Sequence, residues 1–409
     1  MRKRGNIVGL DIGTTKVCVV AGEVVGSELE IRRVGTSVST GLKKGVITHI
    51  EPTVESIRRA VQEAASSTRA EIGEVYIGIK GNHIRGIRGH GAIGINGKEI
   101  SPLDMERVIE SAKTVYMPLD REVLHVIPTG YTVDGQNGIK DPTGVSGVRL
   151  EADVHIITGA LSPLQNLLKC CEMSGLEVIE IVFEPLAAAE STITDEEKEL
   201  GIALVDIGAT TEIALYKDGF LQHISNLPVG GQHFTNDIAI GLRIPFADAE
   251  RLKKDSGCAV AGMINDIETI DISAAGQEKK IPRKHLTDII QPRAEELIDL
   301  IKDELLLCSG YGTALSGVVL TGGGSLLEGI DRLAETLLGI PARIGSLDGI
   351  RGCRGSMNNP VYATGVGLVL YGFERESGEA SYESNPVGIL GKMKGWFAGM
   401  FKGNGDSHS

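Results

Sequence analysis

Two stretches of the sequence repeat one pattern, GLDIGTTK at residues 9–16 and LVDIGATT at residues 204–211. In each, an apolar strand ends in an aspartate, Asp11 or Asp206, and a turn with glycine and hydroxyl residues follows. Glycine lets backbone N–H groups approach phosphate oxygens, and the hydroxyl groups add hydrogen-bond donors. Either turn alone would also fit a plain β-hairpin with a solvated aspartate, but the duplication favours a pair of phosphate-binding turns.

The residues of these turns suit phosphate groups with a bound metal ion. Lys16 supplies a point positive charge. Asp11 and Asp206 supply two carboxylates, which can hold a hydrated Mg²⁺ because that ion prefers oxygen ligands and keeps several waters. The remaining candidates for phosphate contacts are Gly13, Thr14, Thr15, Gly208, Ala209, Thr210 and Thr211.

Three further stretches accompany this pair. FEPLAAA at residues 183–189 places Glu184 at a strand end, before a helix of small residues that begins with proline. VVLTGGGS at residues 318–325 runs a strand into Gly322, Gly323 and Gly324, which can lay backbone against a nucleotide. ATGVGL at residues 363–368 is typical of a second small-residue helix. Each alone would also fit an ordinary strand-to-helix turn or a packed helix between domains.

Length and composition indicate a large, acidic, globular protein. The chain has 409 residues, of which 42% are hydrophobic and 23% charged, enough for two or more lobes with their own cores. Its net charge of −13 argues against nucleic acid as a partner, because non-specific binding of that kind depends on clustered Lys and Arg. The six cysteines include no C-x-x-C pair, which favours reduced thiols over a zinc site. Because neither a signal peptide nor a membrane span is predicted, the body is expected to be soluble and cytoplasmic.

Taken in order, the five stretches resemble the two phosphate motifs, the adenosine motif and the two connecting helices of the actin, Hsp70 and sugar-kinase superfamily. Within it, the chain is most similar to the FtsA family of bacterial cell division proteins. A long insertion stands between Ile79 and Glu184, where that family carries a distinctive subdomain, and residues 230–231 and 249–253 look like its second lobe. The resemblance implies an α/β protein with a two-lobed actin-like (ribonuclease H-like) fold, an inserted α+β subdomain and a C-terminal amphipathic helix.

The same resemblance implies a division of the chain. The first-lobe core is expected at residues 1–82 and 161–200, with the inserted FtsA-type subdomain at 83–160. The second-lobe core is expected at 201–230 and 309–373, with a subdomain of its own at 231–308. Residues 374–385 are interpreted as a flexible linker after a last core helix that ends near Phe373. Residues 386–403 are interpreted as a membrane-targeting helix.

By resemblance, the site would bind Mg·ATP with slow or negligible hydrolysis. Asp11 and Asp206 would bind Mg²⁺ through water. Glu184 would orient the attacking water, although a carboxylate at a helix N-terminus also fits a purely structural role. For the rest, Thr14, Thr15 and Lys16 would hold the β- and γ-phosphates, Gly208 to Thr211 would close the other side, Gly230, Gly231, Glu250 and Lys253 would lie at the ribose, and Gly322 to Gly324 would flank the adenine.

The stretch at residues 385–403 has the pattern of an amphipathic helix. It carries three lysines, no acidic residue and the only tryptophan of the chain. Seven apolar side chains fall within one arc of about 140° on a helical wheel, which fits a helix lying on an anionic lipid surface. A helix docked on the protein's own core is the alternative. The apolar set is Ile389, Leu390, Met393, Trp396, Phe397, Met400 and Phe401, and the basic set is Lys392, Lys394 and Lys402.

The family resemblance also implies partners and a place in the cell. The chain would polymerise with itself, anchor filaments of the tubulin-like protein FtsZ and meet downstream division proteins. It would do so at the septum, as a peripheral protein on the cytoplasmic face of the membrane. Lys284 and Arg293, on a predicted helix at 283–308, would receive the acidic C-terminal peptide of FtsZ, or would form a solvated basic face. The rival functions are a pilus-assembly adaptor of the PilM kind and an active ATPase or kinase.

Overall fold

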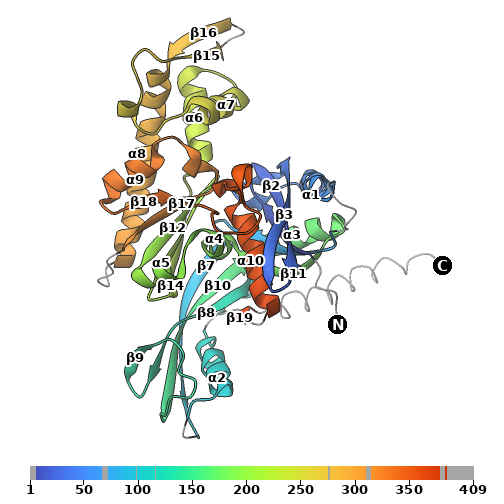
Figure 1. Cartoon of the computed structure of the whole chain (residues 1–409), viewed down its shortest axis with the longest axis vertical. Coiled ribbons are helices and arrows are strands. Elements are labelled where there is room, and N and C mark those ends of the chain that lie inside the picture. The colour runs from blue at the N-terminus through green and yellow to red at the C-terminus, as the bar shows by residue number, and fades with distance from the viewer. Residues whose placement is uncertain are drawn as a thin grey trace, which may run out of the picture.

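The structure, a computed structural model, describes residues 6–66, 72–97, 99–115, 117–274, 277–309, 315–377 and 383–384. At its centre are two five-stranded sheets, one in each of two lobes that lie side by side (Figure 1). The first has the strand order β11-β6-β1-β2-β3, and the second has the order β14-β13-β12-β17-β18. The strand bounds are β1 Ile7–Ile12, β2 Lys16–Val25, β3 Glu28–Val38, β6 Glu74–Ile79, β11 Glu177–Phe183, β12 Ile202–Ile207, β13 Thr211–Lys217, β14 Phe220–Leu227, β17 Gly317–Thr321 and β18 Ala342–Ile344.

The two lobes share one topology. In the first, β1, β2 and β3 pair antiparallel, and β6 and then β11 add in parallel beside β1. In the second, β12, β13 and β14 pair antiparallel, and β17 and then β18 add in parallel beside β12. Both β1 and β12 are buried along their whole length, as expected for strands at the centre of a covered sheet. The predicted α/β class with two related lobes is therefore confirmed.

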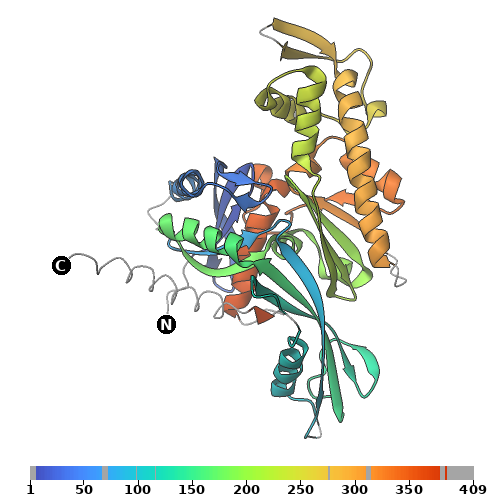
Figure 2. The ribbon, with the colours of Figure 1, turned by 180° about the vertical axis from the view of Figure 1, so that it is seen from behind.

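Two helices of small residues cross between the lobes. The helix α4 (Glu184–Thr192) follows β11 of the first lobe and contacts β12 and β13 of the second. The helix α10 (Ala363–Ser377) follows the second lobe and packs on β1 and β2 of the first. Both views place this helix pair where the lobes meet (Figures 1 and 2). The exchange of helices ties the two sheets into one body.

The remaining elements of the lobes cover the outer faces of the sheets. In the first lobe, α1 buries Val54, Ile57, Ala60 and Ala64 against β2, β3 and α3, a spacing of three to four residues that is typical of an amphipathic helix. In the second lobe, α9 packs on α8 and β18. The bounds are β4 Leu42–Lys43, β5 Val46–Ile47, α1 Ile50–Ala65, α3 Leu161–Met173, α5 Asp195–Leu200 and α9 Ile330–Leu338.

Between β6 and α3, the chain leaves the first lobe and builds a projecting subdomain (Figure 1). Its sheet has the order β8-β10-β7, and α2 packs on β7 and β10. Val108 and Ala112 of α2 join Leu150 and Val154 of β10 in a hydrophobic core separate from those of the lobes. The bounds are β7 Ile84–Gly94, α2 Pro102–Ala112, β8 Arg121–Val133, β9 Gln136–Ile139 and β10 Arg149–Ala160.

The second lobe carries its own extension at the opposite end of the molecule (Figures 1 and 2). The short helix α6 packs on the long helix α8, the short helix α7 packs on α6, and a two-stranded hairpin precedes α8. None of the helices in the described ranges is both long and apolar enough to cross a membrane. The bounds are α6 Gly231–Leu242, α7 Phe246–Ser256, β15 Thr269–Ala274, β16 Gln277–Pro282 and α8 Arg283–Ser309.

The C-terminal part differs from the prediction. The last core helix was expected to end near Phe373, but α10 continues to Ser377, so the predicted flexible linker does not begin at residue 374. The added turn is held because Arg375 Nε lies 3.4 Å from Oε2 of the buried Glu180. Within the same stretch, β19 (Glu383–Ser384) pairs antiparallel with β8. The predicted amphipathic helix, with all its apolar and basic positions, lies outside the described residues.

The helix crossing gives the first testable prediction. A Cβ atom on Gly367 of α10 would lie 1.7 Å from the Ala187 carbonyl oxygen of α4, a backbone atom that cannot move away alone. We expect Gly367→Ala to lower the free energy of unfolding by about 1–3 kcal/mol, even though alanine favours helix. The matched control is Gly94→Ala, where nothing lies within 4 Å of the added atom. Thermal unfolding of both variants measures the difference, and equal melting temperatures would contradict the tight crossing.

Candidate functional site

Three predicted carboxylates meet where the two lobes join, and the name cleft is used for this junction. Asp11 lies in β1, Asp206 lies in the equivalent strand β12, and Glu184 is the first residue of α4. These residues are 7%, 3% and 1% exposed, respectively. Their placement follows from topology, because β1 and β11 run parallel on either side of β6 and their carboxyl ends share one edge of the sheet. The structure thus brings together residues from widely separated parts of the chain.

A lysine that sequence reasoning missed lies among these carboxylates. Lys80 directly follows β6, and its Nζ lies 2.6 Å from Glu184 Oε2 and 3.7 Å from Asp206 Oδ2. Only 12% of its side chain is exposed. Glu212, opposite Asp206 in the β12–β13 pair, was also missed and is fully buried. Both residues have a local signal in the sequence. Lys80 follows an apolar strand and Glu212 interrupts one, and a charged residue in such a place lies at the sheet edge that forms the site.

Burial dominates the electrostatics of this cluster. It raises the pKa of Asp11 and raises that of Glu184 well above its usual value, and Lys80 opposes both shifts. Burial also raises the pKa of Glu212 to about 7, again against the influence of Lys80. For Lys80 itself, burial acts to lower the pKa, but the attraction of the carboxylates, Glu184 first, outweighs it and the pKa is raised. Burial thus favours the protonated forms of Asp11, Glu184 and Glu212, whereas a nearby cation such as Lys80 favours their ionised forms.

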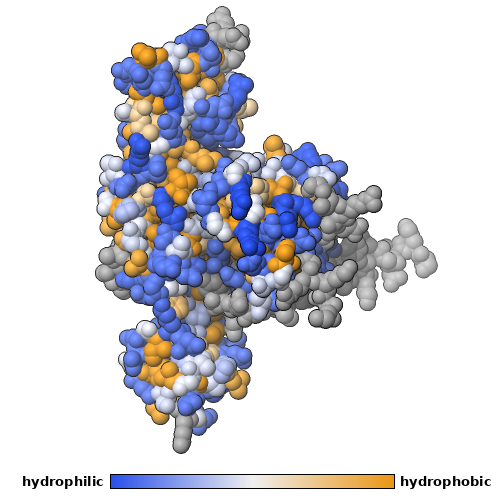
Figure 3. All heavy atoms as spheres, in the orientation of Figure 1, coloured by the Kyte–Doolittle hydropathy of each residue, from blue (hydrophilic) through white to orange (hydrophobic). Residues whose placement is uncertain are grey.

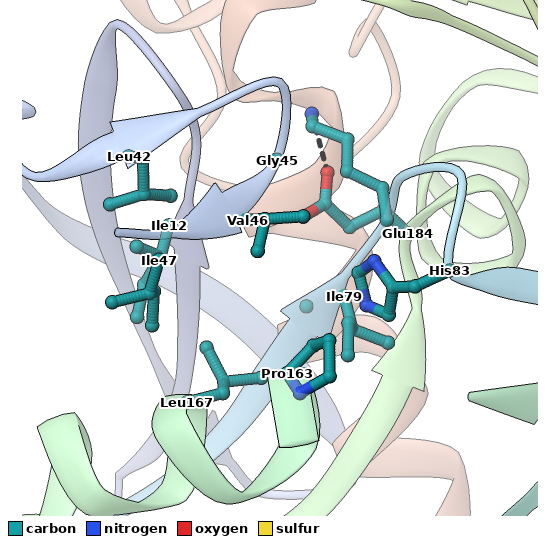
Figure 4. A pocket seen from close by; sticks show the side chains of 12 residues that line it. Ile12, Leu42, Gly45, Val46, Ile47, Ile79, His83, Pro163, Leu167 and Glu184 are labelled. Carbon is teal, nitrogen blue, oxygen red and sulfur yellow. Dashed lines mark ion pairs between the residues drawn. The ribbon is translucent and has the colours of Figure 1, made fainter. Parts of the chain in front are cut away.

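An apolar pocket adjoins the cluster on the first-lobe side (Figure 4). Its walls come from the β4–β5 hairpin, from β1 and β6, and from α3. Figure 4 shows Glu184 at its edge, with the ion pair to Lys80 as a dashed line, opposite Leu42, Ile47 and Leu167. The acidic cluster thus lies between an apolar wall and the cleft.

The first predicted phosphate turn is a tight hairpin between β1 and β2. Gly13 N–H donates to the Lys16 carbonyl at 2.9 Å, and Thr14 Oγ1 accepts a hydrogen bond from the β4–β5 hairpin at 3.0 Å. Thr15 is exposed at the tip. Lys16 Nζ donates to the Val361 carbonyl at 2.7 Å, so its charge points toward the segment that precedes α10. The turn is therefore closed by its own backbone hydrogen bond, and its lysine ties it to the segment before α10.

The second turn repeats this hairpin between β12 and β13. Gly208 N–H donates to the Thr210 carbonyl at 2.9 Å, and Ala209 lies at the tip. Thr210 Oγ1 donates to Glu212 at 2.7 Å, and Thr211 Oγ1 donates to the backbone just before α6 at 2.8 Å. Both threonine hydroxyls thus donate hydrogen bonds within the protein. The two turns resemble each other in their backbone, because in each the glycine N–H donates to a carbonyl of the same turn.

The residues predicted at the ribose gather beside the second turn. Gly231 N–H donates to the carbonyl of the second turn's glycine at 2.7 Å, with Gly230 stacked closely against that turn. Lys253 Nζ donates to the Gly231 carbonyl at 2.9 Å, to Thr235 Oγ1 at 2.8 Å and to Glu250 at 2.7 Å. The helices α6 and α7 are thereby fixed against the turn. Their contact with a ribose stays a prediction.

The triple glycine lies against the carboxylate of the second lobe. Gly322 has a φ of +78°, and a Cβ atom there would lie 2.1 Å from Asp206 Oδ1. A Cβ atom on Gly324 would lie 2.3 Å from the Ile207 side chain, whereas Gly323 has open space. Glycine is required at Gly322 for both its conformation and this approach. The adenine contact predicted for these glycines remains a prediction.

The cluster fits a divalent cation held through water. Asp11 Oδ1 and Glu212 Oε2 are buried without a hydrogen-bond partner in the described part of the chain, so each leaves an oxygen for a water or an ion. In the same ranges, no group of three or more His, Cys, Asp or Glu side chains is placed to hold a metal directly. Asp11 and Asp206 on facing lobes would hold such a cation, and Mg²⁺ with its retained waters is the chemistry they suit.

The two basic residues predicted to bind a peptide lie far from this cleft, on α8. Lys284 Nζ lies 2.8 Å from Asp266 Oδ1, and its side chain is 47% exposed. Arg293 donates to Asp237 through Nε at 2.6 Å and also pairs with Glu296. Both are therefore neutralised by acidic neighbours, and Lys284 is the more accessible of the two.

Comparison with solved structures gives the class of protein. The chain resembles a chain of the PilM-PilN type IV pilus biogenesis complex, with a TM-score of 0.68, 19% identity and coverage of 91% of this chain and 100% of the other. It also resembles MreB5 of Spiroplasma citri bound to ADP, with a TM-score of 0.54, 17% identity and coverage of 91% and 98%. These likenesses concern the fold alone. Together with the two lobes of one topology, they show that the chain has the actin-like fold.

Sequence comparison gives the family. The family model described as cell division protein FtsA matches residues 203–367, and one described as SHS2 domain inserted in FTSA matches residues 81–158. Cell division protein FtsA of Pseudomonas aeruginosa is 42% identical and covers 97% of this chain and 98% of its own length. Cell division protein FtsA of Escherichia coli K12 is 35% identical, with coverage of 97% of this chain and 98% of its own length. That of Bacillus subtilis is 37% identical, with coverage of 89% of this chain and 82% of its own length. The chain belongs to the FtsA family and is an actin-like cell division protein.

Burial of Glu212 predicts a pH-dependent stability. Its pKa is raised to about 7, so between its unfolded pKa and that value the folded protein keeps a proton that the unfolded chain loses. Stability therefore falls as pH rises through this window. We expect Glu212→Gln, which keeps the acceptor for Thr210, to raise the melting temperature by a few degrees near pH 8 and by less near pH 5.

Melting curves across this range test the prediction, with exposed Glu335→Gln as control. A Glu212→Gln variant whose difference from the wild type does not change with pH would contradict the assignment.

Proposed function

We propose that the chain binds Mg·ATP in the cleft and serves as a membrane-tethered adaptor that anchors FtsZ filaments during division. The observation that carries the nucleotide part is the hairpin turn repeated in both lobes, with the buried carboxylates Glu184 and Asp206 gathered around Lys80 beside it. Two of the solved neighbours are MreB5 of Spiroplasma citri bound to ADP and the same protein bound to AMPPNP. Those are related folds, and they support a nucleotide as the ligand of this cleft.

The roles follow from the geometry. The amides of both turns and Lys16 would hold the phosphates, and Asp11 and Asp206 would hold Mg²⁺ through water, which neutralises phosphate charge when it is bound. Glu184 is positioned as a base, but its carboxylate is paired with Lys80 at 2.6 Å, which disfavours proton transfer from a water. Slow hydrolysis is therefore expected, and the nucleotide would act mainly by shifting conformational populations.

Removal of one metal-facing carboxylate tests the nucleotide site. We expect Asp206→Ala to weaken binding of Mg·ATP at least about tenfold, because it removes the second-lobe contact to the cation. Fluorescence titration with a labelled ATP analogue measures the change. The control is Asp299→Ala, an exposed acid on α8. Unchanged affinity in Asp206→Ala would refute this use of the cleft.

Self-assembly is supported by exposed apolar side chains at both ends of the molecule. Leu103, Leu119 and Val148 are exposed on the inserted subdomain, and Ile240 and Ile267 are exposed at the opposite end. In Figure 3, hydrophobic groups appear among hydrophilic ones on the projecting subdomain. Different surfaces at the two ends suit head-to-tail contacts, which generate open filaments when the rotation does not close.

The membrane tether is proposed from the sequence of the C-terminal stretch, with its apolar and basic faces. A helix of this kind binds a lipid surface through buried apolar area and attraction to anionic headgroups. Such tethering would place the protein on the cytoplasmic face of the membrane at the division septum. It would also make binding multivalent in a filament.

Deletion of residues 385–409 tests the tether. We expect the full chain to pellet with anionic vesicles and the shortened chain to remain in the supernatant, because the tail would supply the lipid contact. Vesicles of neutral lipid and high salt are the controls, since both remove the electrostatic part. Equal pelleting of the two chains would contradict the tether.

The FtsZ contact is proposed on the basic side of α8. Lys284 is the sharper probe, because Lys284 and its partner Asp266 are both exposed, whereas reversing Arg293 would leave the half-buried Asp237 without its partner. We expect Lys284→Glu to weaken binding of an acidic FtsZ C-terminal peptide several-fold, with Lys302→Glu on the same helix as control. Peptide titration by fluorescence anisotropy decides, and equal affinity in the two variants would count against this surface. Downstream division proteins would bind elsewhere on the same filament.

A further inference from the structure

Among the described residues of the cleft, Lys80 is the one first-lobe side chain that forms an ion pair with Asp206, the carboxylate of the second lobe. Its Nζ contacts Glu184, lies 3.7 Å from Asp206 Oδ2, and lies 3.7 Å from the point where a Cβ atom of Gly208 would be. The lysine thus starts at the end of β6 and ends beside the second phosphate turn. No predicted role accounts for this position.

The ammonium group lies where a metal ion would be needed. Asp11 and Asp206 are the two carboxylates that would hold a hydrated cation, and Glu184 and Glu212 lie close enough to interact with the same ammonium group. A buried ammonium and a divalent cation would neutralise the same oxygens. A hydrated Mg²⁺ needs room for its waters beside each carboxylate, and the Lys80 ammonium group lies 3.7 Å from Asp206 Oδ2 and 2.6 Å from Glu184 Oε2.

We propose that Lys80 is a resident cation of this site, which neutralises the carboxylates and joins the two lobes until a divalent cation displaces it. This inference rests on the proposed nucleotide function. It adds that Lys80 competes with the metal ion for the same carboxylates. Displacement of Lys80 would also release Glu184 from its ion pair, so that a free carboxylate appears beside the phosphates only when the cation is in place. Through Lys80, metal binding would therefore decide whether Glu184 is paired or free.

A purely structural ion pair makes a different prediction. Removing one partner of such a pair lowers stability because a buried charge is left alone, and Mg²⁺ would not restore it. If Lys80 takes the place of a divalent cation, its removal creates a site that Mg²⁺ itself can fill. Stabilisation by Mg²⁺ without any nucleotide separates the two roles.

The test uses the full chain and MgCl₂ at constant ionic strength, with melting temperature as the readout. In Lys80→Met we expect a low melting temperature without the metal and a rise of about 3 °C or more at millimolar Mg²⁺. In the wild type we expect a much smaller rise, because the ammonium already occupies the site. The matched control is Lys198→Met, which removes a buried lysine paired with Glu190 at 3.1 Å but outside the cleft. That variant should not respond to Mg²⁺ beyond the wild type.

The outcomes separate cleanly. An equal rise in the wild type and Lys80→Met, no rise in either, or the same rise in Lys198→Met would each overturn the inference. If Lys80→Met does not fold, the double variant Lys80→Met/Glu184→Gln removes both partners and should show the same gain of response. Binding of a labelled ATP analogue by the wild type is measured in parallel. Nucleotide binding without the Lys80 effect refutes this inference alone, whereas no nucleotide binding refutes the proposed function.

Discussion

The structure depends on the burial of several carboxyl groups around one ammonium group. Asp11, Glu184 and Asp206 come from three separate segments, and each would be costly to bury alone as a charge. Lys80 makes their burial tolerable by direct contact with two of them. A protein that needed only stability would gain little from such a cluster, since apolar residues of equal volume often serve better. The cluster therefore indicates a ligand that completes its charge balance.

The rest of the fold serves to place these groups. Parallel pairing of β1, β6 and β11 brings three strand ends to one edge, and the repeated topology brings Asp206 to the facing edge. The crossing of α4 and α10 sets the distance between the lobes, and the glycine at position 367 allows that distance. Gly322, which has no side chain, likewise leaves room for the Asp206 carboxylate. Close backbone approach is thus a shared requirement of the cleft, and it accounts for small residues that carry no chemistry themselves.

Much of this arrangement could be predicted from the sequence, and the exceptions have physical reasons. The duplicated turns, the strand-end carboxylates and the inserted segment have local patterns, so their fold class and family follow correctly. Lys80 follows an apolar strand, which is a local signal, but its place among the carboxylates depends on β6 lying between β1 and β11, which is a long-range pairing. The end of α10 was placed too early because polar composition suggested a linker, whereas contact with buried Glu180 decides the helix length. The roles of the turn residues, the peptide-binding lysine and the lipid-binding tail stay predictions.

We propose that the cleft carboxylates serve a nucleotide with a divalent cation. The most direct measurement is a crystal structure of the full chain with a non-hydrolysable ATP analogue and Mn²⁺, whose anomalous signal locates the metal. We expect the metal between Asp11 and Asp206, phosphates on both turns, and Lys80 Nζ moved away from Glu184. A nucleotide bound elsewhere, or a cleft in which the Lys80–Glu184 pair persists and no metal lies between the two aspartates, would contradict it.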